Sequence, residues 1–361
     1  MQDTDLFHKL TMPMGGRFHR EEAPVEARLA YDEIAERAND LIAVTRDQLQ
    51  TLPPICFDFI QNSSINAVAF KAVGKYFIGI NTGTIFMLRS VLGRILSDAR
   101  LFRRVGDPSK ELKDLEPLSD YSTDADEMLR KMALMTPSDP IRASYAWFLQ
   151  DQAIMFLIGH EISHITRGHV DYLSKQGHVI TKEIDEEGKR DGDEVLQRQA
   201  MEMDADGRSI FSRIDSLRVT FENPAMPPLP WAPSAQGPGQ LIRDWAVSLN
   251  VVFHLFGEKY FTIGELKESN HPPIVLRQIM CNAMAATDIV RTWDHNLEAT
   301  ALESLDAAVG ETNDAFATIL GLEFVSAPEA DKSALYTRGQ QLKDMWNSRL
   351  RHVIQKFAFD F

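Results

Sequence analysis

Cysteine is scarce in this chain, and long apolar runs are missing. Only Cys56 and Cys281 are present, so a disulfide framework is not expected and a reducing compartment fits best. The first residues, MQDTDLFHKLTMPMGG, lack the basic start and the apolar run of a signal peptide. The longest apolar stretches, 153–159 and 245–257, fall well short of the roughly twenty residues of a membrane span. We therefore expect buried core helices at both places, and a cytoplasmic protein without a membrane span.

Basic residues are outnumbered as well. The 38 lysines and arginines stand against 52 acidic residues, and the formal net charge of −14 argues against a nucleic-acid partner. With 44% hydrophobic and 25% charged residues, the composition is that of a globular protein able to bury a sizeable core. The sequence has no internal repeat, and its length of 361 residues exceeds the usual size of one domain.

The spacing of apolar residues predicts an α+β fold that is mainly helical. Three short segments rich in β-branched and aromatic residues, ICFDFI, INAVAFKA and KYFIGIN, predict the strands of a small sheet within residues 55–81. Helical periodicity is found on both sides of it, in the segments 21–50, 84–102, 141–173 and 195–217.

Three polar stretches separate these elements. Residues 105–142 indicate an irregular excursion or lid, 182–194 a charged loop with solvated acids, and 223–239 a loop rich in proline and glycine. We divide the chain into an N-terminal helical segment (1–54), a central domain (55–289) and a helical C-terminal extension (290–361). The central domain carries all the motifs described below.

The segment GHEISHITRGH (159–169) holds two histidines four residues apart. On a helix, His160 and His164 lie on one face a turn apart, so both imidazoles can reach one ion. Glu161 is placed to polarise a water molecule at the metal rather than to bind the metal. Because so short a pattern recurs by chance and catalytic zinc needs a third protein ligand, that ligand has to be found elsewhere.

Two positions close to the pair can be weighed first. A metzincin pattern would need Gly at 167 and His at 170, where this chain has Arg167 and Val170, so that class is excluded. His169 follows His164 by five residues and would face away from the pair by about 140° on a continuing helix. This favours an exposed or capping histidine over a metal ligand, although His169 could still line a cleft.

The stretch MEMDADGRS (201–209) offers a better third ligand. Glu202 and Asp206 are four apart on a predicted helix, hence on one face. Glu202 would complete a His2Glu site with one open position, and Asp206 could accept the outer N–H of a ligand histidine. Glu194, two turns earlier, is the fallback ligand, and Asp204 is expected to point elsewhere. Taken by itself, Glu202 would be an ordinary solvent-facing acid.

These motifs together resemble the gluzincin zinc metallopeptidases of the HtpX and CaaX-prenyl-protease type. HEISHITRGH, EMDAD and NHPPIVLRQI (270–279) follow the order in which that family carries HExxH, ExxAD and HPPxxxR. The strand pair within 65–83 is similar to the family's hairpin, whose edge strand lies above the cleft. The resemblance covers about residues 55–280 and implies a zincin-like core with one Zn²⁺ held by His160, His164 and Glu202.

The chain departs from the family in two respects. Those proteins are usually membrane-embedded, whereas this chain has no span, which argues against a membrane substrate; and Gln278 follows Arg277 where an isoleucine is usual. Among relatives without a span, the motifs look most like the phage-exclusion Lit peptidases, which act on a translation elongation factor.

The resemblance implies a zinc-dependent endopeptidase acting on a cytosolic protein, in stress or phage defence, with a translation factor as one candidate substrate. Glu161 would be the general base. His271 would donate to the oxyanion or, alternatively, only shape the turn of the two prolines that follow it. Arg277 would pair with a carboxylate such as Asp206. The strand 75–81 would bind an extended peptide by strand addition or be an ordinary edge strand.

Two other interpretations stay open. Proteins with HExxH can act as regulatory or sensor modules with rare or switched proteolysis, and residues 105–142 and 290–361 would then be interaction surfaces. Turnover of a protein substrate discriminates between the two. A purely structural zinc site is disfavoured, because such sites normally have four protein ligands, usually including cysteine, and neither cysteine is near the motif.

Overall fold

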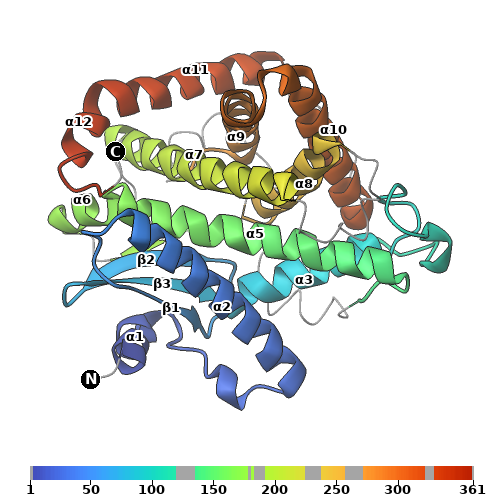
Figure 1. Ribbon diagram of the computed structural model, residues 1–361, viewed down its shortest axis with the longest axis horizontal. Helices are drawn as coiled ribbons and strands as arrows, with labels where there is room; N and C mark the ends of the chain where they lie inside the picture. The colour runs from blue at the N-terminus through green and yellow to red at the C-terminus, as the bar shows by residue number, and fades with distance from the viewer. Residues whose placement is uncertain are drawn as a thin grey trace.

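The computed structural model is mainly helical, with one long helix at its centre (Figure 1). It describes residues 3–118, 135–177, 180–182, 192–223, 237–256, 271–321 and 329–359. Helix α5 (Pro140–Thr166) runs across the middle of the molecule, with the sheet and the N-terminal helices on one side and α7 to α11 on the other. The predicted α+β class with a small sheet is confirmed.

The sheet has four strands in the order β1–β3–β2–β4. They are β1 (Ile55–Ile60), β2 (Ala67–Ala72), β3 (Lys75–Asn81) and β4 (Ile180–Lys182). β2 and β3 form an antiparallel hairpin in which Val73 and Gly74 both have positive φ, as a type I′ turn requires. β1 pairs with β3 in parallel, and β4 pairs with β2. The three predicted strands are present. β4 is not predicted from the sequence, and only its last residue, Lys182, falls at the start of the predicted charged loop.

The prediction that residues 75–81 form an edge strand is wrong. β3 pairs with β1 on one side and with β2 on the other, so neither of its edges can accept a substrate strand. Residues within the hairpin determine that β2 pairs with β3. Whether β1 then adds beside β3 or beside β2 depends on contacts between residues further apart in the chain. The outer edge of β1 is itself partly covered, because the amide of Phe18 donates to the carbonyl of Phe59 over 2.8 Å.

The two faces of the sheet are covered by different parts of the chain. Alternate residues of a strand point to opposite faces, so each face needs its own cover. Helix α1 (Asp3–Thr11) places Phe7 against Phe70 and Phe77 on one face. The opposite face packs on α5 and on α2 (Val25–Gln48) and joins the main hydrophobic core.

Helix α5 is enclosed by other helices as well as by the sheet. Further helices are α3 (Thr82–Leu96), α7 (Gly192–Glu222), α8 (Pro238–Phe256), α9 (Ile274–Asp288) and α10 (Glu298–Leu320). α3, α7 and α8 contact α5 directly, α9 packs on α7, and α10 packs on α8. Both apolar stretches noted in the sequence, in α5 and in α8, are buried, as expected. The predicted helical segments are helical, although α3 ends before Ser97, α7 begins already at Gly192, and the segment 141–173 is divided into two helices after Thr166.

The start of α5 is fixed by capping and by one buried arginine. The side chain of Asp139 accepts from the backbone amides of Ile141 and Arg142, and Pro140 occupies the first turn, where its missing N–H is not needed. The fully buried guanidinium of Arg142 donates to the backbone carbonyls of Leu96, Asp98, Leu101, Phe102 and Val105. It thereby supplies buried donors to the carbonyls of the last residue of α3 and of the turns that follow it.

The C-terminal extension is helical, as predicted, and returns to the middle of the molecule. It continues with α11 (Glu329–Met345), a π-helical turn (Trp346–Leu350) and α12 (Arg351–Ile354). α11 packs on α7, and Figure 1 shows α12 near α6 (His169–Lys175), at the end of α5. The main hydrophobic core includes residues of all three predicted segments, from Ile34 to Ile354.

The predicted loops lie partly outside the described residues. Residues 119–134 belong to the expected excursion, and residues 183–191 and 224–236 make up most of the two later loops. Within the part of the chain that the structure describes, no helix is long and apolar enough to cross a membrane.

Candidate metal centre

The two motif histidines lie in the last turns of α5, inside the protein. His160, Glu161 and His164 expose 0%, 1% and 2% of their surface. α5 can be buried on nearly all sides here because Gly159 has no side chain. A Cβ at that position would lie 2.7 Å from the Ser209 hydroxyl of α7, so glycine permits the close approach of the two helices.

Glu202 reaches the histidines from α7. Its Oε2 is 3.2 Å from His160 Nε2, and its Oε1 is 3.5 Å from His164 Nε2. The two Nε2 atoms are 2.9 Å apart. One donor atom of each residue can be chosen so that all three lie within 4.8 Å of one another. The three ligands expected from sequence, His160, His164 and Glu202, therefore form one buried group that could hold a metal ion (the metal group).

Charge is favourable for a cation at this group. Burial alone raises the pKa of Glu202, but the charges of His164 and His271, with hydrogen bonds from the two motif histidines, lower it well below its ordinary value. The carboxylate is therefore ionised at neutral pH. One buried carboxylate facing two imidazoles is a donor set of the kind that divalent transition metals select.

Asp206 lies directly behind His160. Its Oδ1 is 2.8 Å from His160 Nδ1, the nitrogen turned away from Glu202. Arg277 of α9 donates to both oxygens of the same carboxylate, from Nε over 2.9 Å and from Nη2 over 2.8 Å. Burial raises the pKa of Asp206, but Arg277 and His160 outweigh this effect, so the net shift is downward. An ionised Asp206 accepts the proton of His160 Nδ1, so His160 Nε2 would present its lone pair to a metal ion bound at this group.

His169 lies in a position that its spacing from His164 does not predict. α5 ends at Thr166, and Gly168, with φ of +81°, turns the chain so that His169 begins a new helix, α6. The His169 ring is completely buried, and its Nδ1 is 3.1 Å from Nδ1 of His164. The prediction of an exposed or capping histidine is wrong, because it assumes that the helix continues through residue 169.

Asp204 does not belong to the donor group, as expected, but it faces a buried histidine and not solvent. Its Oδ2 is 3.4 Å from His169 Nε2. Arg167 holds the carboxylate through Nε at 2.7 Å and Nη2 at 3.0 Å. Burial lowers the pKa of His169 to about 4 despite the opposing effect of Asp204, so its ring is neutral at neutral pH. The only sequence signal for this cluster is the glycine that ends α5.

His271 lies at the rim of the group, just before α9. Its Nδ1 is 3.4 Å from Glu202 Oε2, and its side chain is 17% exposed, more than any of the three candidate ligands. Its carbonyl accepts from Gln199 of α7 over 3.1 Å, and Arg338 of α11 donates to the same glutamine over 2.9 Å. The C-terminal extension thus helps to position the segment that carries His271.

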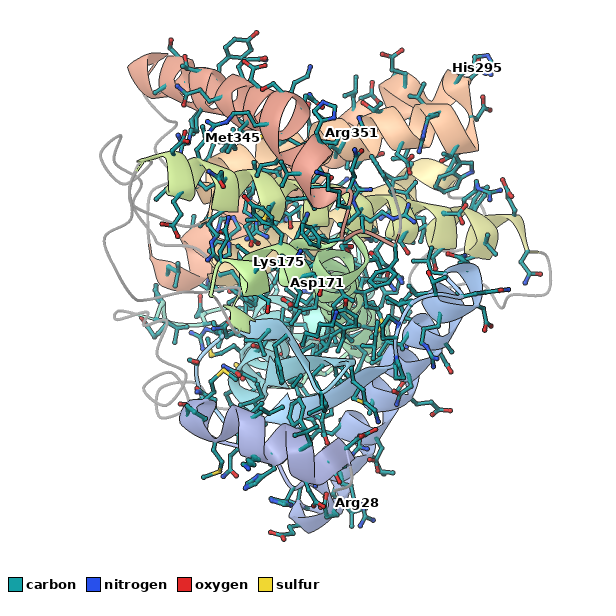
Figure 2. All side chains as sticks on the ribbon, turned by 90° about the vertical axis from the view of Figure 1, so that its left-hand side faces the viewer. Arg28, Asp171, Lys175, His295, Met345 and Arg351 are labelled. Atoms are coloured by element: carbon teal, nitrogen blue, oxygen red, sulfur yellow. The ribbon has the colours of Figure 1, made fainter. Side chains whose placement is uncertain are left out.

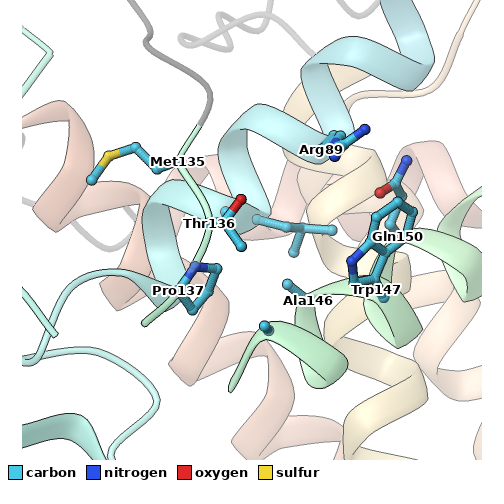
Figure 3. A pocket seen from close by; sticks show the side chains of 10 residues that line it. Arg89, Met135, Thr136, Pro137, Ala146, Trp147 and Gln150 are labelled. Atoms are coloured by element: carbon cyan, nitrogen blue, oxygen red, sulfur yellow. The ribbon is translucent and has the colours of Figure 1, made fainter. Parts of the chain in front are cut away.

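Glu194, the fallback ligand, is described and only partly buried, and it does not belong to the donor group. A small pocket lies elsewhere, between α3 and the first turns of α5, where Arg89, Met135, Trp147 and Gln150 contribute to its lining (Figure 3). Trp147 precedes His160 by thirteen residues on the same helix, so at 1.5 Å per residue this pocket is about 20 Å from the metal group. It has no part in the site described here.

The chemistry of the site has to be inferred from its own geometry. No family model, no curated protein and no solved structure matches this chain.

Proposed function

We propose that this protein is a zinc-dependent endopeptidase of zincin-like fold, with His160, His164 and Glu202 as the metal ligands. The observation that carries the proposal is the buried convergence of these three side chains from α5 and α7. Asp206, on the outer nitrogen of His160, supports the same interpretation, since metal-binding histidines are commonly oriented by a carboxylate.

The spacing of the donor atoms fits zinc. Tetrahedral zinc with bonds of 2.0–2.1 Å places its ligand atoms about 3.4 Å apart. The observed separations are 2.9 Å, 3.2 Å and 3.5 Å. Three protein ligands leave one position for a substrate or water, the pattern of a catalytic site. A closed structural site would need a fourth protein ligand, and Cys281 lies instead against Asp206, with Sγ 3.7 Å from Oδ2.

The residues around the metal group can perform peptide hydrolysis. Zinc, when bound, would supply Lewis acidity towards a water molecule and a carbonyl oxygen. Glu161, next to His160 on α5, would accept the water proton and pass it to the leaving amine. His271, the most exposed histidine of the group, would donate to the oxyanion that develops on the carbonyl. Arg277 would act through Asp206 by fixing the orientation of His160.

The substrate we propose is a cytosolic protein, and a translation factor remains the candidate suggested by family resemblance. Peptide binding by strand addition to β3 is not part of this proposal, since both edges of that strand are paired.

A regulated form of the same activity is favoured by one observation. The candidate ligands and Glu161 expose at most 5% of their surface, so little of the metal group is open to solvent in this structure. This agrees with the alternative in which proteolysis is rare or switched by a partner.

The test compares the wild-type protein with Glu161→Gln. An amide cannot accept the water proton, so this variant should keep its fold and bound zinc but lose hydrolysis. Host-cell lysate is incubated with each protein, and new N-termini are identified by proteomics. Metal content and circular dichroism of both proteins serve as controls. New termini produced equally by both proteins would refute the assigned general base, and an absence of bound zinc would refute the metal site.

A further inference from the structure

His169 lies outside the metal group, and its contacts assign it a positioning role. We propose that His169 fixes the tautomer and orientation of His164, and that Asp204 and Arg167 in turn hold His169. The inference rests on the metal site proposed above, because it concerns how one ligand of that site is supported.

The first step concerns the proton of His164. Its Nε2 faces both His160 Nε2, at 2.9 Å, and Glu202 Oε1, at 3.5 Å. A histidine that binds a metal through Nε2 must present its lone pair there, so its proton is on Nδ1. Two ring nitrogens 3.1 Å apart share one proton in a hydrogen bond. His164 Nδ1–H therefore donates, and His169 Nδ1 accepts.

The second step follows from the first. Because His169 accepts at Nδ1, the proton of its neutral ring is on Nε2. That nitrogen is 3.4 Å from Asp204 Oδ2. The distance is long for a hydrogen bond, so the carboxylate acts on the ring mainly through its charge. Arg167 donates to both oxygens of Asp204, from Nε and from Nη2, and so fixes the orientation of the carboxylate.

Each candidate histidine ligand is therefore supported from behind by its own row of side chains, here called an arm. The arm of His160 consists of Asp206 and Arg277, and the arm of His164 has one more member, His169, before its carboxylate and arginine. His160 donates directly to Asp206, which Arg277 holds. His164 donates to an imidazole, and only then comes a carboxylate held by an arginine. A neutral imidazole is a weaker acceptor than a carboxylate, so His164 should be the less electron-rich of the two ligands.

The C-terminal extension packs against the outer side of the arm that supports His164. The indole of Trp346 meets the His169 ring edge to face, with centroids 5.8 Å apart and an interplanar angle of 85°. The Arg167 guanidinium lies 5.8 Å from the same indole. Figure 2 faces this end of the molecule and shows Met345 and Arg351, which flank the π-helical turn, above the part of α6 labelled by Asp171 and Lys175. His169 therefore has little freedom to rotate.

The experiment measures metal binding by the full chain without relying on activity. Zn²⁺ affinity is determined by competition with a chelator, and the Co²⁺ absorption spectrum reports the ligand field. His169→Phe removes the acceptor while keeping a ring of similar size, and His169→Gln offers an amide oxygen in its place. His254→Phe is the matched control, because His254 is a partly buried histidine stacked on Phe316 in the α8–α10 contact.

We expect His169→Phe to weaken Zn²⁺ binding about 10- to 100-fold, the usual cost of losing an outer partner of a ligand histidine, and to shift the Co²⁺ bands. His169→Gln should recover part of the affinity, and His254→Phe should leave both readouts unchanged. Affinity and spectrum identical to wild type in His169→Phe would overturn the inference, even if the variant melts at a lower temperature.

A second variant covers the case in which His169→Phe does not fold. Asp204→Asn keeps both rings and removes the charge at the outer end of the arm, so weaker Zn²⁺ binding and shifted Co²⁺ bands are expected from it too. Unchanged values would overturn the inference. Failure of the wild-type chain to bind either metal would overturn the proposed function as well, whereas loss of the His169 effect alone would leave that function standing.

Discussion

At the scale of single residues, the site depends on which atoms of each side chain face inward. His160 and His164 each present one nitrogen to the metal group and the other to a partner outside it. Glu202 contributes the negative charge, and burial makes that charge effective because little water screens it. Substitutions here should change metal binding or chemistry much more than they change the fold.

The assignment of the third ligand can be tested with a matched pair of glutamates on α7. Glu202→Ala removes a buried donor within 3.5 Å of both histidines, so bound zinc should fall from about one per chain to a small fraction. Glu194→Ala removes a less buried glutamate of the same helix and should leave zinc unchanged. Metal analysis of the purified variants measures both. Full zinc in Glu202→Ala, with loss in Glu194→Ala, would transfer the ligand role to Glu194.

The role of His271 can be separated from a structural one by kinetics. If its imidazole donates to the oxyanion, the contact strengthens only as charge develops, so His271→Ala should reduce kcat about 100- to 1000-fold with little change in KM. Because His271 Nδ1 is 3.4 Å from a Glu202 oxygen, kcat must be expressed per zinc-loaded molecule. Nearly normal kcat on that basis would limit His271 to shaping the turn before α9.

At the scale of elements, the end of α5 decides the composition of the site. The helix stops at Thr166, Gly168 adopts a left-handed conformation, and α6 turns back with His169 pointing at His164. The tail of the chain packs onto this corner, where the amide of Phe359 donates to the carbonyl of Thr166 over 2.7 Å. The corner thus joins the metal group to the C-terminal extension.

Gly168→Ala should disturb this corner more than a comparable change elsewhere. A Cβ at this position would lie 2.7 Å from the carbonyl carbon of Phe357, and φ of +81° is unfavourable for alanine. Gly74→Ala is the control, because Gly74 has φ of +76° but nothing within 4 Å of its Cβ position. We expect a cost of about 1 kcal/mol from strain alone in the control and a larger cost at Gly168.

Denaturant unfolding of the two variants measures the difference, and chelator competition should show weaker zinc binding only in Gly168→Ala. Equal destabilisation in both variants, without an effect on zinc, would mean that the corner adjusts freely and does not position His169.

At the scale of the whole molecule, the predicted segments do not have separate cores. One hydrophobic core extends from Ile34 in α2 to Ile354 in α12, and α5 is surrounded by elements from every part of the chain. The metal group lies between α5 and α7 inside this core. Metal binding and global stability should therefore be linked, because the unfolded chain cannot bring the three donors together.

Thermal unfolding in rising zinc concentrations tests this linkage. A hundredfold excess of free zinc over its dissociation constant stabilises the native state by about 2.7 kcal/mol, so Tm should increase with zinc in the wild type. Glu202→Ala should show little or no increase. An equal increase in both proteins would mean that zinc stabilises the chain at another site.

The sequence by itself determined most helices and strands and the identity of the three candidate metal ligands. Helical periodicity and alternation predict α2, α5, α7 and the first three strands, because they depend on neighbours a few residues apart. Spacing also predicts that His160 and His164 share one face of their helix and that Glu202 and Asp206 share one face of theirs. The packing of α7 on α5 then brings the two faces together.

Tertiary structure alone decided the rest. Whether β3 is central depends on where β1 adds, and the burial of His169 depends on a chain reversal at Gly168 together with packing from Trp346, far along the sequence. Periodicity cannot represent either, because it describes a helix or strand as if it continued and contains no information on distant partners. The physical reason is that both features are stabilised by contacts between residues far apart in the chain.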